Sequence, residues 1–195
     1  MSLCIRLRMS AMACKKGFTL IELLMTMAIL AILSVSGAWL LIYLVQSSVF
    51  IPNKLNADMV AQEAMDIMIE GDRQARGLRF SRNITESLNE SVAFKNADNL
   101  TVRFRWDSGN KKIYRQINSS AEAVIPYYLG SGVTVAPAAN ASVFSYYDAD
   151  ETSTTDSAGV RRVKMRFKVM TGSGNYSDWE GQAEHVSFVC VRKFE

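Results

Sequence analysis

The feature that most constrains this chain is a long uncharged apolar run close to its N-terminus. The run from Leu23 to Val45 contains no charged residue, and Lys15-Lys16-Gly17 stands a few residues before it. One carboxylate, Glu22, lies at the very start of the run. A helix of this length covers roughly 35 Å, which is enough for the ~30 Å hydrocarbon core of a bilayer. The sequence therefore predicts a membrane-spanning helix with a costly charge near one end.

The distribution of basic residues predicts how this helix is oriented. Arg6, Arg8, Lys15 and Lys16 precede the run, and the next basic residue after it is Lys54. Because basic flanks stay on the cytoplasmic side, residues 1–17 are expected in the cytoplasm and the remainder outside it. These four residues also account for the formal net charge of +3, so the exported part is nearly neutral. Nucleic acid is not an expected partner of such a surface.

Two ordinary processing signals fit the N-terminal segment less well than the lysine–glycine pattern. The segment Ala11-Met12-Ala13-Cys14 has a lipid-attachment flavour, but basic residues rather than an apolar run precede it. Small residues at Ser34-Val35-Ser36-Gly37 offer a signal-peptidase site, but the apolar run continues beyond them. A signal peptide has an apolar region of about 7–15 residues, which is shorter than this run.

The three cysteines do not predict a disulfide. Cys4 and Cys14 precede the apolar run on the reducing side, which leaves Cys190 alone on the oxidising side. The expected role of Cys190 is a small buried hydrophobe on a strand, with an intermolecular bridge as the alternative.

A second helical pattern follows Pro52, which is expected to interrupt or kink the first helix. The pattern continues to about Leu78, and Gly71 and Gly77 weaken its last turns. Its expected apolar stripe consists of Leu55, Met59, Met65, Met68 and Ile69. The polar stretch 81–98 is expected to be a loop.

Beyond residue 98 the apolar period changes to two, which indicates strands. Residues 100–106 and 111–117 flank the turn 107–110 and predict a hairpin, and residues 142–147, 162–169 and 186–191 predict further strands. Short strands joined by tight turns favour an antiparallel sheet, and the preceding amphipathic helix can cover its apolar face. The expected fold class is α+β, with a long N-terminal helix packed on a C-terminal antiparallel sheet.

No residue set in the chain predicts catalysis, a metal site or a cofactor. His185 is the single histidine and has no predictable nucleophile beside it. Asp148, Asp150 and Asp156 lack the glycine and glutamate that a calcium loop of the EF type needs, so a solvated acidic turn is expected. The basic side of the strand 162–168 predicts either a solvated sheet face or a docking strip for an acidic neighbour.

The ten residues from Lys15 to Leu24 resemble the N-terminal motif of type IV pilins and type II secretion pseudopilins. The resemblance implies that a membrane prepilin peptidase recognises Lys15, Lys16 and Gly17, cuts between Gly17 and Phe18, and that Phe18 is then N-methylated. It also implies that Glu22 meets the N-terminal amine of a neighbouring subunit during assembly.

The same resemblance implies a domain layout and a set of partners. Residues 1–17 would be a leader peptide, 18–48 a transmembrane assembly helix, 49–80 an amphipathic helix half and 81–195 an extracytoplasmic β-rich head. The partners would be the prepilin peptidase, other pilin or pseudopilin subunits, an inner-membrane assembly platform and the lipid bilayer. The protein would reside in a bacterial inner membrane and then in a pilus or pseudopilus.

A weaker resemblance concerns the role of the subunit. The segments 70–76 and 146–150 are similar to minor pseudopilin J and the W-type minor pilins. The chain has Trp39 where many major pilins have a proline, and it lacks their C-terminal cysteine pair. These features imply a minor subunit that primes or caps a filament. Two alternatives stay open, a tip adhesin that uses Tyr127, Tyr128, Tyr146 and Tyr147, and an anchored or secreted hydrolase.

Overall fold

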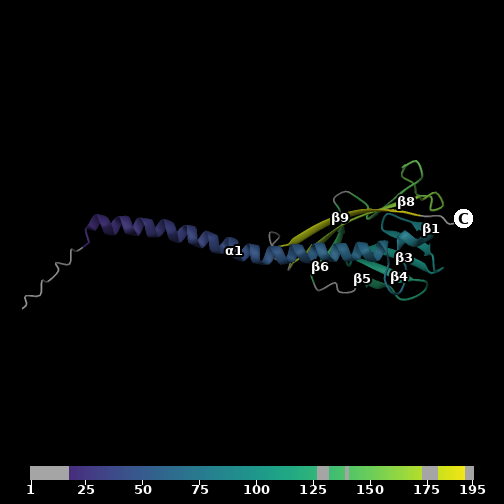
Figure 1. Ribbon diagram of the computed structural model, residues 1–195, viewed down its shortest axis with the longest axis horizontal. Helices are drawn as coiled ribbons and strands as arrows, with labels where there is room; N and C mark the ends of the chain where they lie inside the picture. Colours follow the sequence, from purple (N-terminus) through teal and green to yellow (C-terminus); the bar gives the residue numbers. More distant parts are fainter. Residues whose placement is uncertain (1–17, 127–131, 139–140, 173–179, 192–195) are drawn as a thin grey trace, which may run out of the picture. The chain divides into compact units, whose positions relative to one another are not determined.

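The structure is a computed structural model that describes residues 18–126, 132–138, 141–172 and 180–191. The chain divides into two compact units, Met1–Val45 and Gln46–Glu195, and each is described by itself. The ribbon in Figure 1 shows the α+β character of the chain, with one long helix followed by antiparallel strands. The predicted fold class is therefore confirmed.

The helix α1 runs from Leu20 to Ile69 without a break in its assignment, so Pro52 does not interrupt it. All of its residues in the first unit are exposed. The helix ends nine residues before Leu78, the expected end, and only a short 3₁₀ turn, η1 (Leu78–Phe80), follows. The amphipathic half predicted for 49–80 is thus shorter than expected.

A tight loop after Ile69 explains why the helix ends early. Gly71 has a φ of +92°, a conformation that side chains with a Cβ rarely adopt, and an added Cβ would lie 2.3 Å from the Ala75 carbonyl oxygen. The Gly77 amide donates to the Glu70 carbonyl at 3.0 Å and closes the loop. Glycine therefore stops the helix at residue 71, where the apolar pattern alone predicts continuation.

The first sheet is an antiparallel meander in the order β1-β2-β3-β4-β5. Its strands are β1 (Ser81–Ser87), β2 (Ser91–Asn96), β3 (Thr101–Asp107), β4 (Lys112–Ile117) and β5 (Ala123–Ile125). The predicted hairpin is confirmed as β3 and β4. The prediction of a loop over 81–98 is wrong, because β1 is a polar edge strand and β2 is buried on both faces. Neither strand shows the clean alternation that predicts a half-buried strand.

The second sheet is built around one long strand. Its members are β6 (Val133–Pro137), β7 (Phe144–Tyr147), β8 (Arg162–Thr171) and β9 (Gly181–Cys190). Along β8, β6 pairs with residues 167–171 and β7 with residues 162–165, while β9 pairs with the whole strand. The predicted strands 142–147, 162–169 and 186–191 are confirmed, whereas β5 and β6 were not predicted from the sequence.

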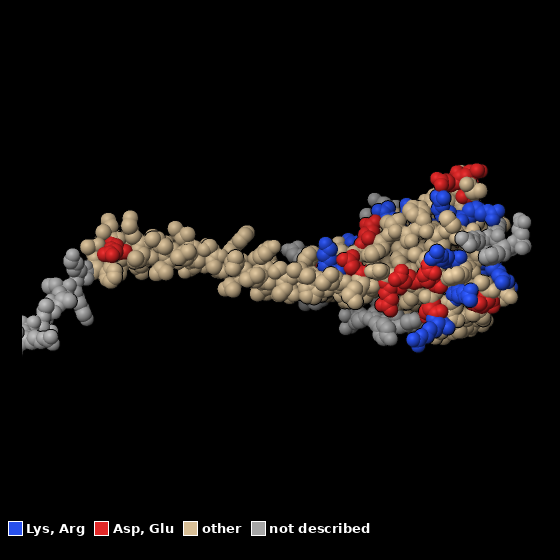
Figure 2. All heavy atoms as spheres, viewed as in Figure 1, with Lys and Arg blue, Asp and Glu red and all other residues tan. Residues whose placement is uncertain are grey.

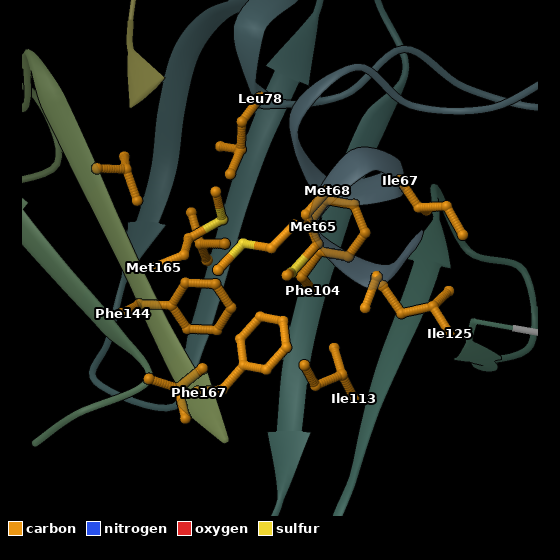
Figure 3. Packing of buried hydrophobic residues seen from close by; sticks show 14 of the residues in the cluster. Met65, Ile67, Met68, Leu78, Phe104, Ile113, Ile125, Phe144, Met165 and Phe167 are labelled. Carbon is orange, nitrogen blue, oxygen red and sulfur yellow. The ribbon is translucent and has the colours of Figure 1, made fainter. Parts of the chain in front are cut away.

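The core of the second unit lies between both sheets and the C-terminal part of α1 (Figure 1). The buried helix face is rich in small side chains and comprises Ala57, Val60, Ala61, Ala64, Met65, Ile67 and Met68. Figure 3 shows Met65 and Met68 beside Phe104 of the first sheet, with Phe144 and Phe167 nearby. The expected stripe is wrong at its start, because Leu55 and Met59 are 58% and 68% exposed.

Two side chains join the sheets by hydrogen bonds across the core. The Trp106 indole on β3 donates to the Val135 carbonyl on β6 at 3.0 Å. The Tyr146 hydroxyl on β7 lies 2.7 Å from the Ser91 carbonyl and 2.9 Å from the Leu88 carbonyl, at the turn between β1 and β2. Burial of Tyr146 raises its pKa, with a smaller contribution from Glu86, so the phenol keeps its proton and stays a donor.

Replacing Tyr146 by phenylalanine should lower the free energy of unfolding by about 1 kcal/mol, because the ring still fills its place and only the donor is lost. Denaturation by urea, followed by tryptophan fluorescence, measures this difference. Tyr114, which lies on the half-buried face of β4, provides the matched control, and Tyr114→Phe should have a smaller effect. Equal losses in the two variants would contradict a bridging role for the Tyr146 hydroxyl.

The helix and the β8–β9 hairpin approach each other backbone to backbone at one place. An added Cβ on Gly181 would lie 2.1 Å from the carbonyl carbon of Asn53 and 2.3 Å from the amide nitrogen of Lys54. The Thr171 hydroxyl, directly opposite Gly181 in the ladder, donates to the Asn53 carbonyl at 2.5 Å. Glycine at the start of β9 therefore allows a contact that no other residue permits.

Candidate assembly and processing site

The first turn of α1 is capped by Thr19. Its hydroxyl oxygen accepts a hydrogen bond from the Glu22 amide at 3.3 Å, and its carbonyl accepts from the same amide at 3.1 Å. Threonine followed three residues later by glutamate is the capping-box pattern. Thr19 was not among the predicted site residues, although this spacing could have identified it. The cap fixes the start of the helix two residues after Gly17.

The predicted processing residues lie at the border of the described chain. Phe18 is the first described residue and is 78% exposed. Lys15, Lys16 and Gly17 lie outside the described residues, so the structure gives no geometry for the predicted cleavage site.

Glu22 lies in the first turn of the helix and is exposed. Within the described part of the chain, no lysine or arginine forms an ion pair with it. The positive end of the helix dipole favours a carboxylate at this position by about 0.3–1 kcal/mol. A charge in lipid costs about 2.5–3.5 kcal/mol on insertion scales, so the dipole offsets only part of that cost. The arrangement leaves Glu22 in need of a cationic partner.

The other polar groups in this part of the helix are satisfied internally. The hydroxyls of Thr26, Ser34 and Ser36 donate to carbonyls three or four residues earlier, at 2.8, 2.7 and 3.0 Å. In lipid, every hydrogen-bonding group needs a partner from the protein itself. These residues therefore add little polarity to the helix surface, and the contrast with Glu22 becomes sharper.

The described helix is long and apolar enough to cross a membrane by length and composition. Figure 2 shows it almost free of blue and red atoms, in contrast to the charged surface of the second unit. Exposed leucine, isoleucine, methionine and valine side chains cover it on all sides. An apolar surface of this extent is not stable in water and requires lipid or other helices around it.

The remaining sequence candidates do not form a reaction centre. His185 lies within β9 rather than at a strand start, and its Nε2 is 3.6 Å from Oδ1 of Asp58 on the helix. The Asp148 carboxylate accepts the amides of Asp150 and Thr152 at 2.9 Å, which organises the predicted acidic turn. Among the described residues, no cluster of histidine, cysteine, aspartate and glutamate could hold a metal ion.

Two predictions about single residues are corrected. Cys190 is at the end of a strand as expected, but its side chain is exposed rather than buried. Tyr146 is buried in the core, so it is not available for an adhesin surface. Tyr127 and Tyr128, which the same hypothesis used, lie outside the described residues.

The basic side of β8 is largely engaged in local contacts. Arg162 pairs with Glu151 at 2.8 Å, Arg166 pairs with Glu184 at 2.7 Å, and the Lys164 ammonium lies 5.3 Å from the centre of the Phe188 ring. These contacts favour a solvated sheet face. The docking strip for an acidic neighbour stays a prediction.

Comparison with known proteins gives one match, at the N-terminus. Residues 12–38 match the model of the prokaryotic N-terminal methylation motif. No curated protein and no solved structure matches the chain. The matched residues include the predicted cleavage site, the Thr19 cap and Glu22, and they continue into the exposed apolar helix. The motif and the helix together indicate a protein of the type IV pilin and pseudopilin type that is anchored in a membrane.

Proposed function

We propose that this protein is a minor pilin or pseudopilin subunit that primes or caps a filament drawn from the inner membrane. The observation that carries the proposal is the exposed carboxylate of Glu22 in the capped first turn of an otherwise uncharged helix. The motif is structural rather than enzymatic. In this proposal the protein is a substrate of an enzyme and not an enzyme itself.

The proposed mechanism uses two products of one cleavage. A prepilin peptidase removes residues 1–17, and Phe18 then carries a new N-terminal amine, which is methylated. That amine is cationic and lies four residues from Glu22 along the chain, so an adjacent subunit can present its own amine to this carboxylate. Assembly then exchanges lipid contact for helix packing and an ion pair, which removes the cost of an unpaired charge.

The exposed apolar side chains of α1 support this assembly mode. Leu55 and Met59 are one turn apart on the helix and point away from the core, so they extend the apolar surface beyond the span 18–48. A helix face of this kind is suited to packing against a neighbouring helix. We propose the same domain layout as the sequence predicts, with residues 1–17 cytoplasmic and the head extracytoplasmic.

The minor role is proposed because two features of major pilins are missing from the sequence. The exported part contains one cysteine, Cys190, so it cannot form an internal disulfide loop. Trp39 occupies a position where a proline would loosen the helix. The segment 70–76, which carries the likeness to minor subunits, forms the tight loop that ends α1 and contacts Arg115 of β4.

Replacing Glu22 by alanine should leave cleavage intact and lower incorporation into filaments by about tenfold or more. One lost ion pair of about 1.4 kcal/mol accounts for a tenfold change, and the lipid cost of the charge is larger. The measurement compares the mature subunit in sheared filaments with that in membranes. Glu22→Asp is the matched control because it keeps the charge, and it should retain more incorporation than Glu22→Ala. Normal incorporation of Glu22→Ala would remove the proposed ion-pair role.

A further inference from the structure

One edge of β9 has no strand beside it in the described part of the chain. The strand pairs with β8 over ten residues, and sheet order leaves its other edge free. The Val191 amide donates to the Arg161 carbonyl at 2.8 Å, so backbone groups of odd-numbered residues in this ladder face β8. Because the direction alternates along a strand, those of Val186, Phe188 and Cys190 face the free edge.

This edge lacks the protections that usually prevent strand addition. Natural edges carry lysine, proline or a bulge, or are very short. The half of β9 from residue 186 onward contains none of these residues and its register with β8 is regular. Val186 and Phe188 are 48% and 55% exposed on its outer face.

A groove of about 590 Å³ lies along the same part of the edge. We call it the β9 groove, and the residues that define it here are Ile69, Arg76, Arg79, Phe80, Phe188 and Cys190. The helix end, the loop after it and η1 form one wall, and β9 forms the other. The groove is therefore bounded on one side by backbone groups that can pair and on the other by side chains.

The charge of the β9 groove has one sign. Its lining contains two arginines and no carboxylate. Asp98 lies 3.4 Å from Arg76 and Glu70 pairs with Arg79, and these contacts hold the guanidinium groups in place while 55% and 65% of the arginine side chains stay exposed. Each guanidinium has five N–H donors, so both can bind a further carboxylate.

We propose that the β9 groove binds an extended, acidic segment of another protein as an added strand on β9. Main-chain hydrogen bonds to the free edge would give affinity, alternate apolar side chains would contact Phe80 and Phe188, and one or two carboxylates would meet Arg76 and Arg79. The inference goes beyond the proposed function, because it assigns a partner-binding site in the head that does not use the N-terminal motif.

The test uses the full chain in detergent and a defined peptide. The peptide has eight residues, alternates valine with threonine and ends in two aspartates; one control peptide carries lysines instead of the aspartates, and another has a proline at its centre. Fluorescence anisotropy should show that the aspartate peptide binds at least tenfold more tightly than either control. Equal binding of all three peptides would overturn the proposal.

Variants of the chain test the site. Phe188→Pro removes an edge donor inside the groove and should weaken binding at least tenfold, whereas Gln182→Pro, on the same edge but outside the groove lining, should leave binding unchanged. If Phe188→Pro does not fold, the double variant Arg76→Glu and Arg79→Glu replaces it, and should reverse the preference toward the lysine peptide. An unchanged preference in that variant would overturn the proposal.

Two further results are distinguishable. Dimers of the chain that the peptide disperses would mean that a second copy occupies the groove, which would overturn the assignment of an acidic foreign segment. Cleavage at Gly17 is followed in the same preparations by the size of the subunit. Intact cleavage without peptide binding would overturn this inference alone, and the proposed function would stand.

Discussion

Replacing Gly17 by tryptophan is expected to leave almost all of the protein as an uncut precursor that does not enter filaments. The prepilin peptidase must place the Gly17–Phe18 bond against its reacting groups, and an indole on the residue before that bond displaces it. A misplacement of about 1 Å can lower a rate 100-fold. Immunoblots of membranes and sheared filaments, with Edman sequencing of the subunit, measure the outcome.

The control for this variant keeps the residue small. Gly17→Ala adds one methyl group and should still be cut, more slowly than the native chain. Mature Gly17→Trp protein of normal size in filaments would contradict the processing hypothesis. A mature N-terminus at Gly37 in the native chain would instead support ordinary secretion.

Replacing Arg115 by alanine is expected to lower the free energy of unfolding by about 3–5 kcal/mol, which is typical of removing one partner of a buried ion pair. Arg115 points from β4 toward the loop after α1, and only 2% of its side chain is exposed. Its Nη1 lies 2.7 Å from Oδ1 of Asp72, and its Nη2 donates to Oε1 of Gln74 at 2.8 Å.

The loss would spread beyond the ion pair because Asp72 organises the loop. Its Oδ1 atom also accepts the amides of Gln74 and Ala75 at 2.9 and 3.2 Å. Without the guanidinium, a carboxylate that is only 19% exposed would keep its charge beside an empty space. The loop ties the end of α1 to the first sheet, so its release should also loosen that contact.

Urea denaturation of the full chain in detergent, followed by tryptophan fluorescence, measures the effect of Arg115→Ala. Arg82→Ala is the matched control, since Arg82 is an exposed arginine on β1 whose described contact is a 3.3 Å hydrogen bond to Asn99. It should change stability by less than about 0.5 kcal/mol. A similar small change for Arg115→Ala would contradict the proposed stabilising role.

The parts of the fold that the sequence predicts well are those where one pattern dominates. The run after Glu22 is long enough to specify a helix by itself, and the alternation along β8 leaves no other interpretation. β2 was missed because both of its faces are buried, so its residues do not alternate. The end of α1 was missed because the loop that stops it depends on Gly71 and on a distant arginine.

The candidate site shows the same division between local and distant information. Glu22 and the cleavage site follow from a contiguous motif, and the Thr19 cap could have been predicted from its spacing to Glu22. The β9 groove could not be predicted in this way. It combines a strand edge with residues of the loop and η1, which lie more than 100 residues earlier in the sequence.

The close approach at Gly181 has a mechanical consequence. The helix backbone at Asn53 is held by the Thr171 hydroxyl and touches Gly181 on the adjacent strand, so the first residues of the β8–β9 hairpin grip the helix at a single point. A force along the helix axis would therefore load the longest hairpin in shear, across ten paired residues at once. In that geometry the hydrogen bonds share the load rather than open one after another, so the head can be pulled by its helix without being peeled apart.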